Sequence, residues 1–316
     1  MSQVSFRVGL IMLILVGTHW LSSSERVAAQ PEPASPEPAS SVLVTVDGTP
    51  IQQAELELQW MMRQTPAQDR GRYRRAVIEQ LIDQQLVRVY LKRYGTKVDP
   101  RLVERQVVRI KDLIRRRDGD ATQVLKTLGL DEAGLNRTLS LPLAWQTHMR
   151  ATITSEQLRD YFAQHRSEFD GTRVRAAQIL IPAKTAEQRA AALKQLADIR
   201  AQVQDGPLTF ERAVALYSQA PSRDEQGDIG YFSFRGKMPQ SFTRHAFPLK
   251  VGQMSQPFAS TFGVHLCRVT DRKPGTLSLE DVRSVVFKRL SDQVWKQLVA
   301  RLRLKATIKR DASPAE

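Results

Sequence analysis

The sequence predicts an α+β fold in which a small sheet domain is inserted into a mainly helical module. Three observations predict it. Apolar residues recur at helical spacing before residue 170, a glycine-punctuated segment over 173–273 alternates short strands with helices, and a long apolar stripe returns after residue 278. Because an amphipathic helix of that length needs a partner surface, we expect the last stripe to pack on the N-terminal helices and complete their module.

The composition is that of a globular protein with a strongly basic charge. Hydrophobic residues make up 41% of the 316 residues and charged residues 25%, both ordinary values. The 47 Lys and Arg against 33 Asp and Glu give a formal net charge of +14. Such a charge favours polyanionic partners, namely nucleic acid, acidic membrane surfaces or acidic client chains. The basic residues are spread through the chain, however, which is typical of solvated helix faces.

Residues 1–29 are predicted to be a cleaved signal peptide. Arg7 precedes the apolar run Val8–Val16, and Val27–Ala29 supplies the small-residue pattern for cleavage before Gln30. A retained membrane anchor is the alternative, but the run is shorter than the roughly 20 apolar residues that span a bilayer. No Cys stands near the cleavage region, so we expect no lipoprotein. The protein is therefore predicted to be periplasmic or otherwise exported, which argues against nucleic acid as a partner.

The predicted signal is followed by a linker and by the first part of the helical module. Residues 30–41 contain the doubled pentamer PEPAS-PEPAS, a Pro-rich linker with little apolar content. Residues 42–170 open with a β-rich run at 42–46 and an Asp47-Gly48 turn. Helical stripes follow at 78–89, 103–114 and 125–145, and Thr154 with Gln157 makes a helix-starting capping box.

A long C-terminal helix is predicted within residues 277–310. Ser278 and Asp281 form a second capping-box pattern at its start. Apolar residues then recur every four positions, at Val282, Val286, Leu290, Val294, Leu298 and Leu302. This stripe is the one that we expect to complete the helical module.

The inserted segment, residues 173–273, is predicted to be a compact α+β unit of its own. Its pattern gives, in order, a strand at 174–181, helices from 185 to about 204 and at 210–217, a strand at 229–232, a helix near 240–247 and strands near 255–258 and 264–270.

Three motifs in this segment resemble those of parvulin-type peptidyl-prolyl isomerases. The first covers residues 227–242, GDIGYFSFRGKMPQSF, and is similar to the parvulin pattern G-D-L-G-x-F-S-R-G-x-M-x-x-x-F. The second and third are residues 246–257, AFPLKVGQMSQP, and residues 262–266, FGVHL, which resemble A-F-x-L-x-x-G-x-x-S-x-P and a closing G-x-H strand. With the Val46–Ile51 start and the terminal helix, the whole chain resembles the SurA/PrsA class of envelope foldases.

The resemblance implies where an X-Pro bond would be bound and twisted. Rotation about that bond has a barrier near 18–20 kcal/mol and needs no covalent step. An enzyme can lower the barrier by holding the prolyl ring on apolar side chains and by favouring the twisted amide. The resemblance gives a catalytic pair and a set of substrate-binding residues: catalytic His265 and Gln178, and substrate-binding Ile229, Met238, Phe242, Phe232 and Ser260. Core packing is the alternative interpretation of the apolar members.

The polar half of this site departs from the family pattern. Gln178 stands where active parvulins usually carry a His, and Ala220 stands where they carry a Cys or Asp. Phe234 is an insertion of one residue in the S-R-G turn. Gln forms hydrogen bonds but carries no charge, so the resemblance implies weak turnover.

No cofactor or metal is expected. The histidines match no ligand spacing, and the Asp118-Gly119-Asp120 turn is too short for a calcium loop. Cys267 is the only cysteine, so no intramolecular disulfide can form. It shares a strand face with His265, which makes a Cys–His dyad geometrically conceivable.

Two classes of function remain open at this point. One is a prolyl isomerase with chaperone activity toward secreted or envelope proteins, and the other is an ATP-independent holdase or peptide-binding module that uses the same pocket and the helical module. The expected partners are unfolded or extended proline-containing polypeptides, with weak contact to anionic envelope surfaces and no nucleic acid. A basic adaptor for acidic envelope polymers is a third, less favoured class.

Overall fold

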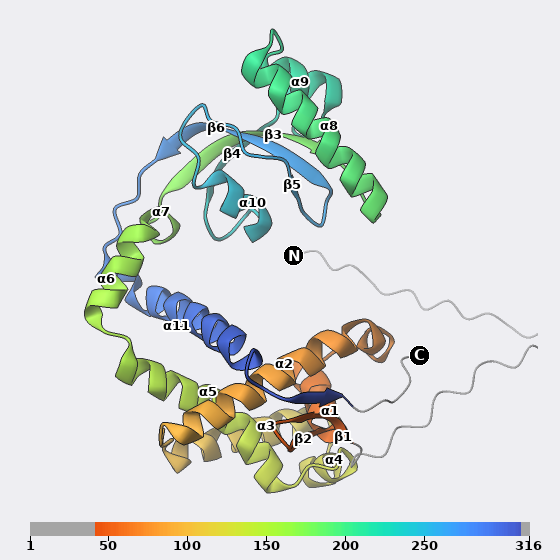
Figure 1. Ribbon diagram of the computed structural model, residues 1–316, viewed down its shortest axis with the longest axis vertical. Coiled ribbons are helices and arrows are strands. Elements are labelled where there is room, and N and C mark those ends of the chain that lie inside the picture. Colours follow the sequence, from red (N-terminus) through yellow and green to blue (C-terminus); the bar gives the residue numbers. More distant parts are fainter. Residues whose placement is uncertain (1–41, 311–316) are drawn as a thin grey trace, which may run out of the picture. The chain divides into compact units, whose positions relative to one another are not determined.

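The computed structural model describes residues 42–310, apart from the side chains of residues 117 and 118 (Figure 1). The predicted signal peptide and the Pro-rich linker lie outside the described residues.

The described chain begins with a small sheet that the sequence predicted only in part. Strand β1 (Val42–Val46) pairs antiparallel with β2 (Thr49–Gln52), and the turn between them places Asp47 at φ +46° and Gly48 at φ +79°. Positive φ at both central residues is the geometry of the two-residue hairpin that Asp-Gly favours. Strand β7 (Ile308–Arg310) pairs with the other edge of β1, so the strand order is β2-β1-β7.

Helices dominate residues 53–169. They are α1 (Gln53–Arg63), α2 (Ala67–Arg93), α3 (Pro100–Asp118), α4 (Ala121–Thr127), α5 (Glu132–Thr152), α6 (Ser155–Gln164) and α7 (Arg166–Phe169). The predicted capping box starts α6, where the Thr154 hydroxyl accepts the Gln157 N–H at 3.2 Å and the Gln157 side chain accepts the Thr154 N–H at 2.9 Å. Local hydrogen bonding of this kind is why the helix start was readable from the sequence.

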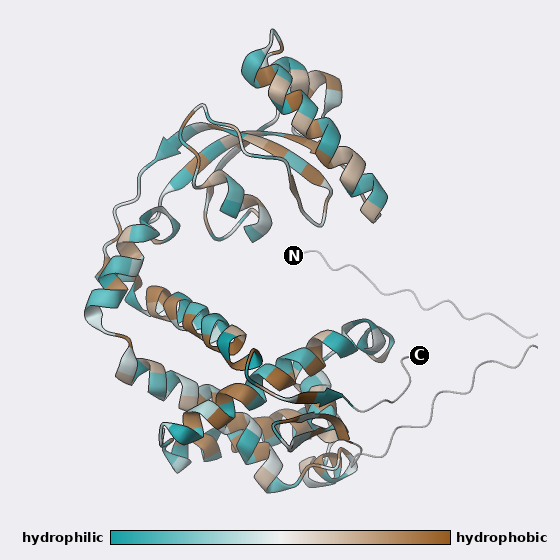
Figure 2. Ribbon diagram, in the orientation of Figure 1, coloured by the Kyte–Doolittle hydropathy of each residue, from teal (hydrophilic) through white to brown (hydrophobic). Residues whose placement is uncertain are grey.

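The terminal helix α11 (Leu279–Arg303) packs on the N-terminal helices, as the stripe predicted. Val286 is buried with Leu158 of α6, and Leu298 is buried with Leu91 of α2. The Trp145 indole N–H of α5 donates a 2.9 Å hydrogen bond to the Ser291 hydroxyl. Figure 2 shows apolar and polar residues alternating along this helix, as one buried side requires. No helix within residues 42–310 is long and apolar enough to cross a membrane.

Helix α11 occupies only part of the predicted range 277–310. It ends at Arg303, and residues 308–310 form β7 instead. The Arg303 guanidinium pairs with Glu79 and Asp83 of α2, which fixes the last turn against that helix. Beyond it, the Thr307 N–H donates to the Asp47 carboxylate at 2.8 Å, so the chain leaves the helix and joins the hairpin.

The inserted segment forms a four-stranded antiparallel sheet with the order β4-β3-β6-β5. Its elements are β3 (Arg173–Ile181), α8 (Ala186–Asp205), α9 (Phe210–Tyr217), a short 3-10 turn (Arg223–Glu225), β4 (Asp228–Ser233), α10 (Gln240–Ala246), β5 (Phe258–Ala259) and β6 (Val264–Lys273). The strand expected at 255–258 is reduced to β5, because upstream of it only Met254 bridges to Arg268 of β6.

Each face of this sheet has its own core. Ile179 and Leu266 are fully buried on one face with residues of α8 and α9. Val174 and Cys267 are buried on the other face with α10 and a group of phenylalanines. Figure 1 shows α8 and α9 on one side of β3 and β6, and α10 on the other. Two faces that are each covered explain why successive residues are buried in β3 (176–180) and in β6 (264–267).

Candidate functional site

His265 lies on β6, on the sheet face that α10 covers, and its ring nitrogens contact two polar side chains. Nε2 is 2.6 Å from the Ser260 hydroxyl, and Nδ1 is 3.0 Å from the Gln178 side-chain oxygen. The register of β3 and β6 explains the second contact, because Gln178 pairs with Cys267 and Leu180 pairs with His265. Residues two apart on paired strands share a face, so the Gln178 and His265 side chains meet diagonally.

The His265 imidazole is neutral in this arrangement. Burial lowers the pKa of His265 to about 4, so the ring is uncharged near neutral pH. Its Nδ1–H donates to Gln178, and Nε2 accepts the Ser260 hydroxyl proton. The Ser260 oxygen in turn accepts the Phe262 N–H at 3.0 Å, which completes a chain of three hydrogen bonds. His265 is thus held in one orientation and one tautomer.

Aromatic rings enclose the imidazole. The Phe258 ring stacks on His265 with 5.3 Å between centroids, and the Phe242 ring meets it edge-on at 5.6 Å. Phe242 also contacts Phe232 edge-on at 5.7 Å. These apolar neighbours supply the burial that keeps the imidazole neutral.

The apolar residues expected at the prolyl ring form one cluster, but they differ in exposure. Phe242 and Phe232 are buried, with 1% and 3% of their surfaces exposed. Ile229 and Met238 are half-buried and pack against the same cluster. Among the predicted apolar residues, Ile229 and Met238 therefore supply the accessible surface, and the two phenylalanines belong to the buried part of the cluster.

The loop before β4 is fixed against β3 beside the site. The Ser218 hydroxyl accepts the N–H groups of Leu180 and Ala220, each at 3.3 Å, and the Ala220 side chain is buried. Farther along, the Gln178 N–H donates to the Gly227 carbonyl at 2.9 Å. Gly227 has φ +82°, and a Cβ there would lie 2.6 Å from the Gln178 carbonyl oxygen, so only glycine fits.

The structure brings the seven predicted site residues into one region, by direct contact or through the shared cluster. Two neighbours were missed by the sequence analysis, namely Phe258 and Ser218. Phe258 directly follows the second motif, so its position was a usable signal. Ser218 acts through its hydroxyl on backbone N–H groups of β3 and of its own loop, and the sequence gives no local signal for the contact with β3.

A Cys267–His265 dyad does not form. Cys267 is fully buried, and burial raises the pKa of its thiol to about 11, so it stays protonated at neutral pH. Both ring nitrogens of His265 are occupied by other partners. Within residues 42–310 no three His, Cys, Asp or Glu side chains lie close enough together to hold a metal ion.

Residues 178–271 match the family model described as "Rotamase: PPIC-type PPIASE domain". The chain carries a parvulin-type prolyl isomerase domain. The matched range contains all seven predicted site residues, and by family resemblance the protein is a peptidyl-prolyl isomerase.

Sequence similarity to known proteins extends well beyond this parvulin-type domain. "Foldase protein PrsA" of Exiguobacterium sibiricum is 28% identical over 72% of this chain and 68% of its own length. "Putative peptidyl-prolyl cis-trans isomerase SurA" of Haemophilus influenzae is 28% identical over 79% of this chain and 82% of its own. A crystal structure of PrsA from Bacillus anthracis covers 72% of this chain and 96% of its own at 23% identity, with a TM-score of 0.43.

The buried imidazole predicts a pH-dependent stability for the parvulin-type domain. The folded pKa of His265 is about 4, below the ordinary value of about 6.5, so between these values the unfolded chain binds more protons than the folded one. The contribution of the neutral imidazole to the free energy of unfolding is therefore fully present above pH 6.5. About 3 kcal/mol of this contribution is lost as the pH falls toward 4.

Urea unfolding of wild type and His265→Gln between pH 7 and pH 4 measures this contribution. The difference in free energy of unfolding between the two proteins should shrink as the pH falls. Only the wild type loses stability there, because the glutamine cannot be protonated. His245→Gln, at an exposed histidine on α10, is the control and should keep the wild-type profile. A pH-independent difference between wild type and His265→Gln would contradict the neutral, buried imidazole.

Proposed function

We propose that this protein is an exported folding factor whose parvulin-type domain binds X-Pro segments of unfolded polypeptides and isomerises them slowly. The observation that carries the proposal is the oriented, neutral His265, which contacts Phe242 of the apolar cluster that also holds half-exposed Ile229 and Met238. This combination offers an apolar seat for a prolyl ring with a fixed hydrogen-bonding group beside it.

In this proposal the residues have distinct roles. Ile229 and Met238 contact the prolyl ring, while Phe242 and Phe232 support them from beneath. Ser260 and His265 present a fixed dipole toward the amide that is being twisted. Catalysis then comes from excluding water and from binding the twisted amide better than the planar one.

Turnover is proposed to be weak because the polar half is reduced. His265 donates to Gln178, whose amide oxygen can accept this proton but can neither donate it onward nor become charged. Ala220 offers no side-chain polar atom at the loop that Ser218 holds against β3. Less electrostatic stabilisation of the twisted amide leaves a higher barrier.

A non-catalytic holdase is the second candidate, and the same two positions favour it. If Gln178 and Ala220 stabilise the twisted amide too little for turnover, the apolar surface of Ile229 and Met238 still binds extended chains. The helical module, which we propose comprises residues 42–170 and 277–310, would then provide most of the chaperone activity, with the isomerase domain at 173–273. Weak contact of the basic surface with anionic envelope polymers belongs to either candidate.

Export is part of the proposal through residues 1–29, and N-terminal sequencing of the secreted fraction tests it. The mature chain should begin at or near Gln30. Recovery of an uncleaved chain starting at Met1 or Ser2 in the cytoplasm would contradict export.

The binding role of Met238 is testable with a matched methionine. Met238→Ala removes accessible apolar surface at the site, so affinity for a proline-containing peptide should fall about tenfold, or ~1.4 kcal/mol. Met254→Ala is the control, because Met254 is also half-buried in this domain but packs with the α8 and α9 core on the opposite face of the sheet. Fluorescence anisotropy of a labelled X-Pro peptide measures both. Equal losses in the two variants would contradict a binding surface at Met238.

A further inference from the structure

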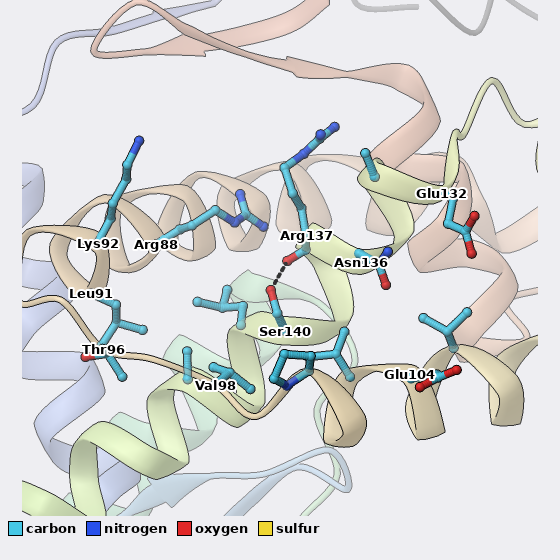
Figure 3. A pocket seen from close by; sticks show the side chains of 16 residues that line it. Arg88, Leu91, Lys92, Thr96, Val98, Glu104, Glu132, Asn136, Arg137 and Ser140 are labelled. Carbon is cyan, nitrogen blue, oxygen red and sulfur yellow. Dashed lines mark hydrogen bonds between the residues drawn. The ribbon is translucent and has the colours of Figure 1, made fainter.

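A groove of about 900 Å³ lies in the helical module, outside the parvulin-type domain (Figure 3). Side chains of α2, α3 and α5 line it together with the loop between α2 and α3. Its apolar part includes Leu91, Val98, Val103, Val107 and Leu141. A groove of this size and lining is large enough for several side chains of an extended peptide.

One cation in the groove has incomplete hydrogen bonding. Arg88 of α2 donates from a terminal nitrogen to the Gln85 side-chain oxygen at 2.5 Å, whereas its buried Nε finds no partner among the described residues. Burial lowers the pKa of Arg88 from its usual value, a shift that Glu55 opposes and the positive charge of Arg137 adds to. A buried donor on a charged group raises the free energy by about 1–3 kcal/mol when neither water nor a ligand accepts its hydrogen bond.

Two further cations line the same groove. Figure 3 shows Arg88 extending from α2 toward α5, which carries Arg137, with Lys92 one turn along α2. Arg137 and Lys92 have no acidic partner among the described ion pairs. The acidic lining residues are Glu104 and Glu132, and the second of these already pairs with Lys111 at 3.4 Å. The α2–α5 side of the groove therefore has an excess of positive charge over an apolar floor.

We propose that this groove binds an extended segment of a client polypeptide in which a carboxylate side chain is flanked by apolar residues. The carboxylate would accept hydrogen bonds from Arg88 and Arg137, and the flanking side chains would cover Leu91, Val103 and Leu141. Arg is suited to this because its guanidinium presents several donors in one plane to a carboxylate. The inference rests on the proposed chaperone role of the helical module and specifies which clients that module prefers.

The test compares two capped, rhodamine-labelled peptides of Val, Leu and Ser that differ only by Glu or Gln at the central position. Wild type should bind the Glu peptide at least tenfold more tightly, and Arg88→Met with Arg137→Gln should reduce that ratio to near one. Methionine keeps the unbranched stem of Arg88 in place while removing its charge. The control, Arg93→Gln with Arg105→Gln, makes the same change in net charge on exposed residues outside the groove lining and should keep the ratio.

Each outcome decides the inference. Equal binding of the two peptides by wild type, or an unchanged ratio in the Arg88 and Arg137 variant, would overturn it. Should the double variant fail to fold by circular dichroism, Arg137→Gln alone, at an exposed position, should still lower the ratio at least threefold. If the chain suppresses client aggregation but binds the Glu and Gln peptides equally, the proposed carboxylate preference of the groove is wrong and the proposed function stands. A preference for Glu without isomerisation or aggregation suppression would instead uphold the groove and overturn the proposed function.

Discussion

Gln178→His combined with Ala220→Asp is expected to raise prolyl isomerase turnover tenfold to a thousandfold. In the proposed site, the two changes introduce the polar side chains that the parvulin pattern carries at these positions, next to a His265 that is already oriented. Missing polar groups that stabilise a transition state commonly raise the barrier by about 1.4–4 kcal/mol. The gain should therefore appear in kcat/KM for an X-Pro peptide, with little change in peptide affinity.

The single variants separate the two positions. Gln178→His should act through the Nδ1 side of His265, because Gln178 is its present partner there. Ala220→Asp places a carboxylate at a buried position of the loop that Ser218 fixes, so some stability should be lost as activity is gained. If the double variant folds and turns over no faster than wild type, the polar departures are not what limits this enzyme.

Removal of residues 278–316 is expected to unfold the helical module. The deletion takes away Val286, Leu298 and Val299, which are all buried against other helices. Burial of such side chains contributes about 1.5–3 kcal/mol each, so these three alone approach the whole stability of a typical domain. The exposed surfaces of α2, α5 and α6 should then cause aggregation.

Two matched proteins make the truncation informative. Deleting only residues 311–316 leaves α11 and β7 in place and should keep a cooperative thermal transition. The isolated segment 173–273 should also fold, because both cores of its sheet consist of its own residues. A truncation at residue 277 that stays monomeric and melts cooperatively would contradict the role given to α11.

Local patterns predicted most of the helices and the inserted sheet. The Ser278 capping box and the four-residue spacing located α11, because both signals lie within a few turns of one helix. Strand β2 was missed although the Asp47-Gly48 turn before it is a local hairpin signal; it has only four residues and leads directly into α1. Strand β7 was missed for the opposite reason, because it has three residues and pairs with β1 across more than 260 residues of chain. Such pairing leaves no periodicity in the sequence around it.

The site was predictable where it follows strand pairing and not where it depends on burial. His265 and Gln178 could be assigned together from motifs on two strands, and the register places them in contact. The burial of Phe242 depends on how α10 packs on the sheet, which its motif does not encode. The groove between α2, α3 and α5 was missed, because an arginine such as Arg88 within a helical stripe is interpreted as one more surface charge.

The rate of cis–trans exchange at an X-Pro bond tests the central claim most directly. Without catalysis this exchange takes tens of seconds at 25 °C, so two-dimensional exchange NMR of a capped peptide detects even weak turnover. The wild-type chain from Gln30 should accelerate the exchange, Met238→Ala should accelerate it less, and Met254→Ala should match wild type. An exchange rate that stays at the uncatalysed value when the peptide is saturated with wild-type protein would contradict an isomerase and leave a chaperone that only binds.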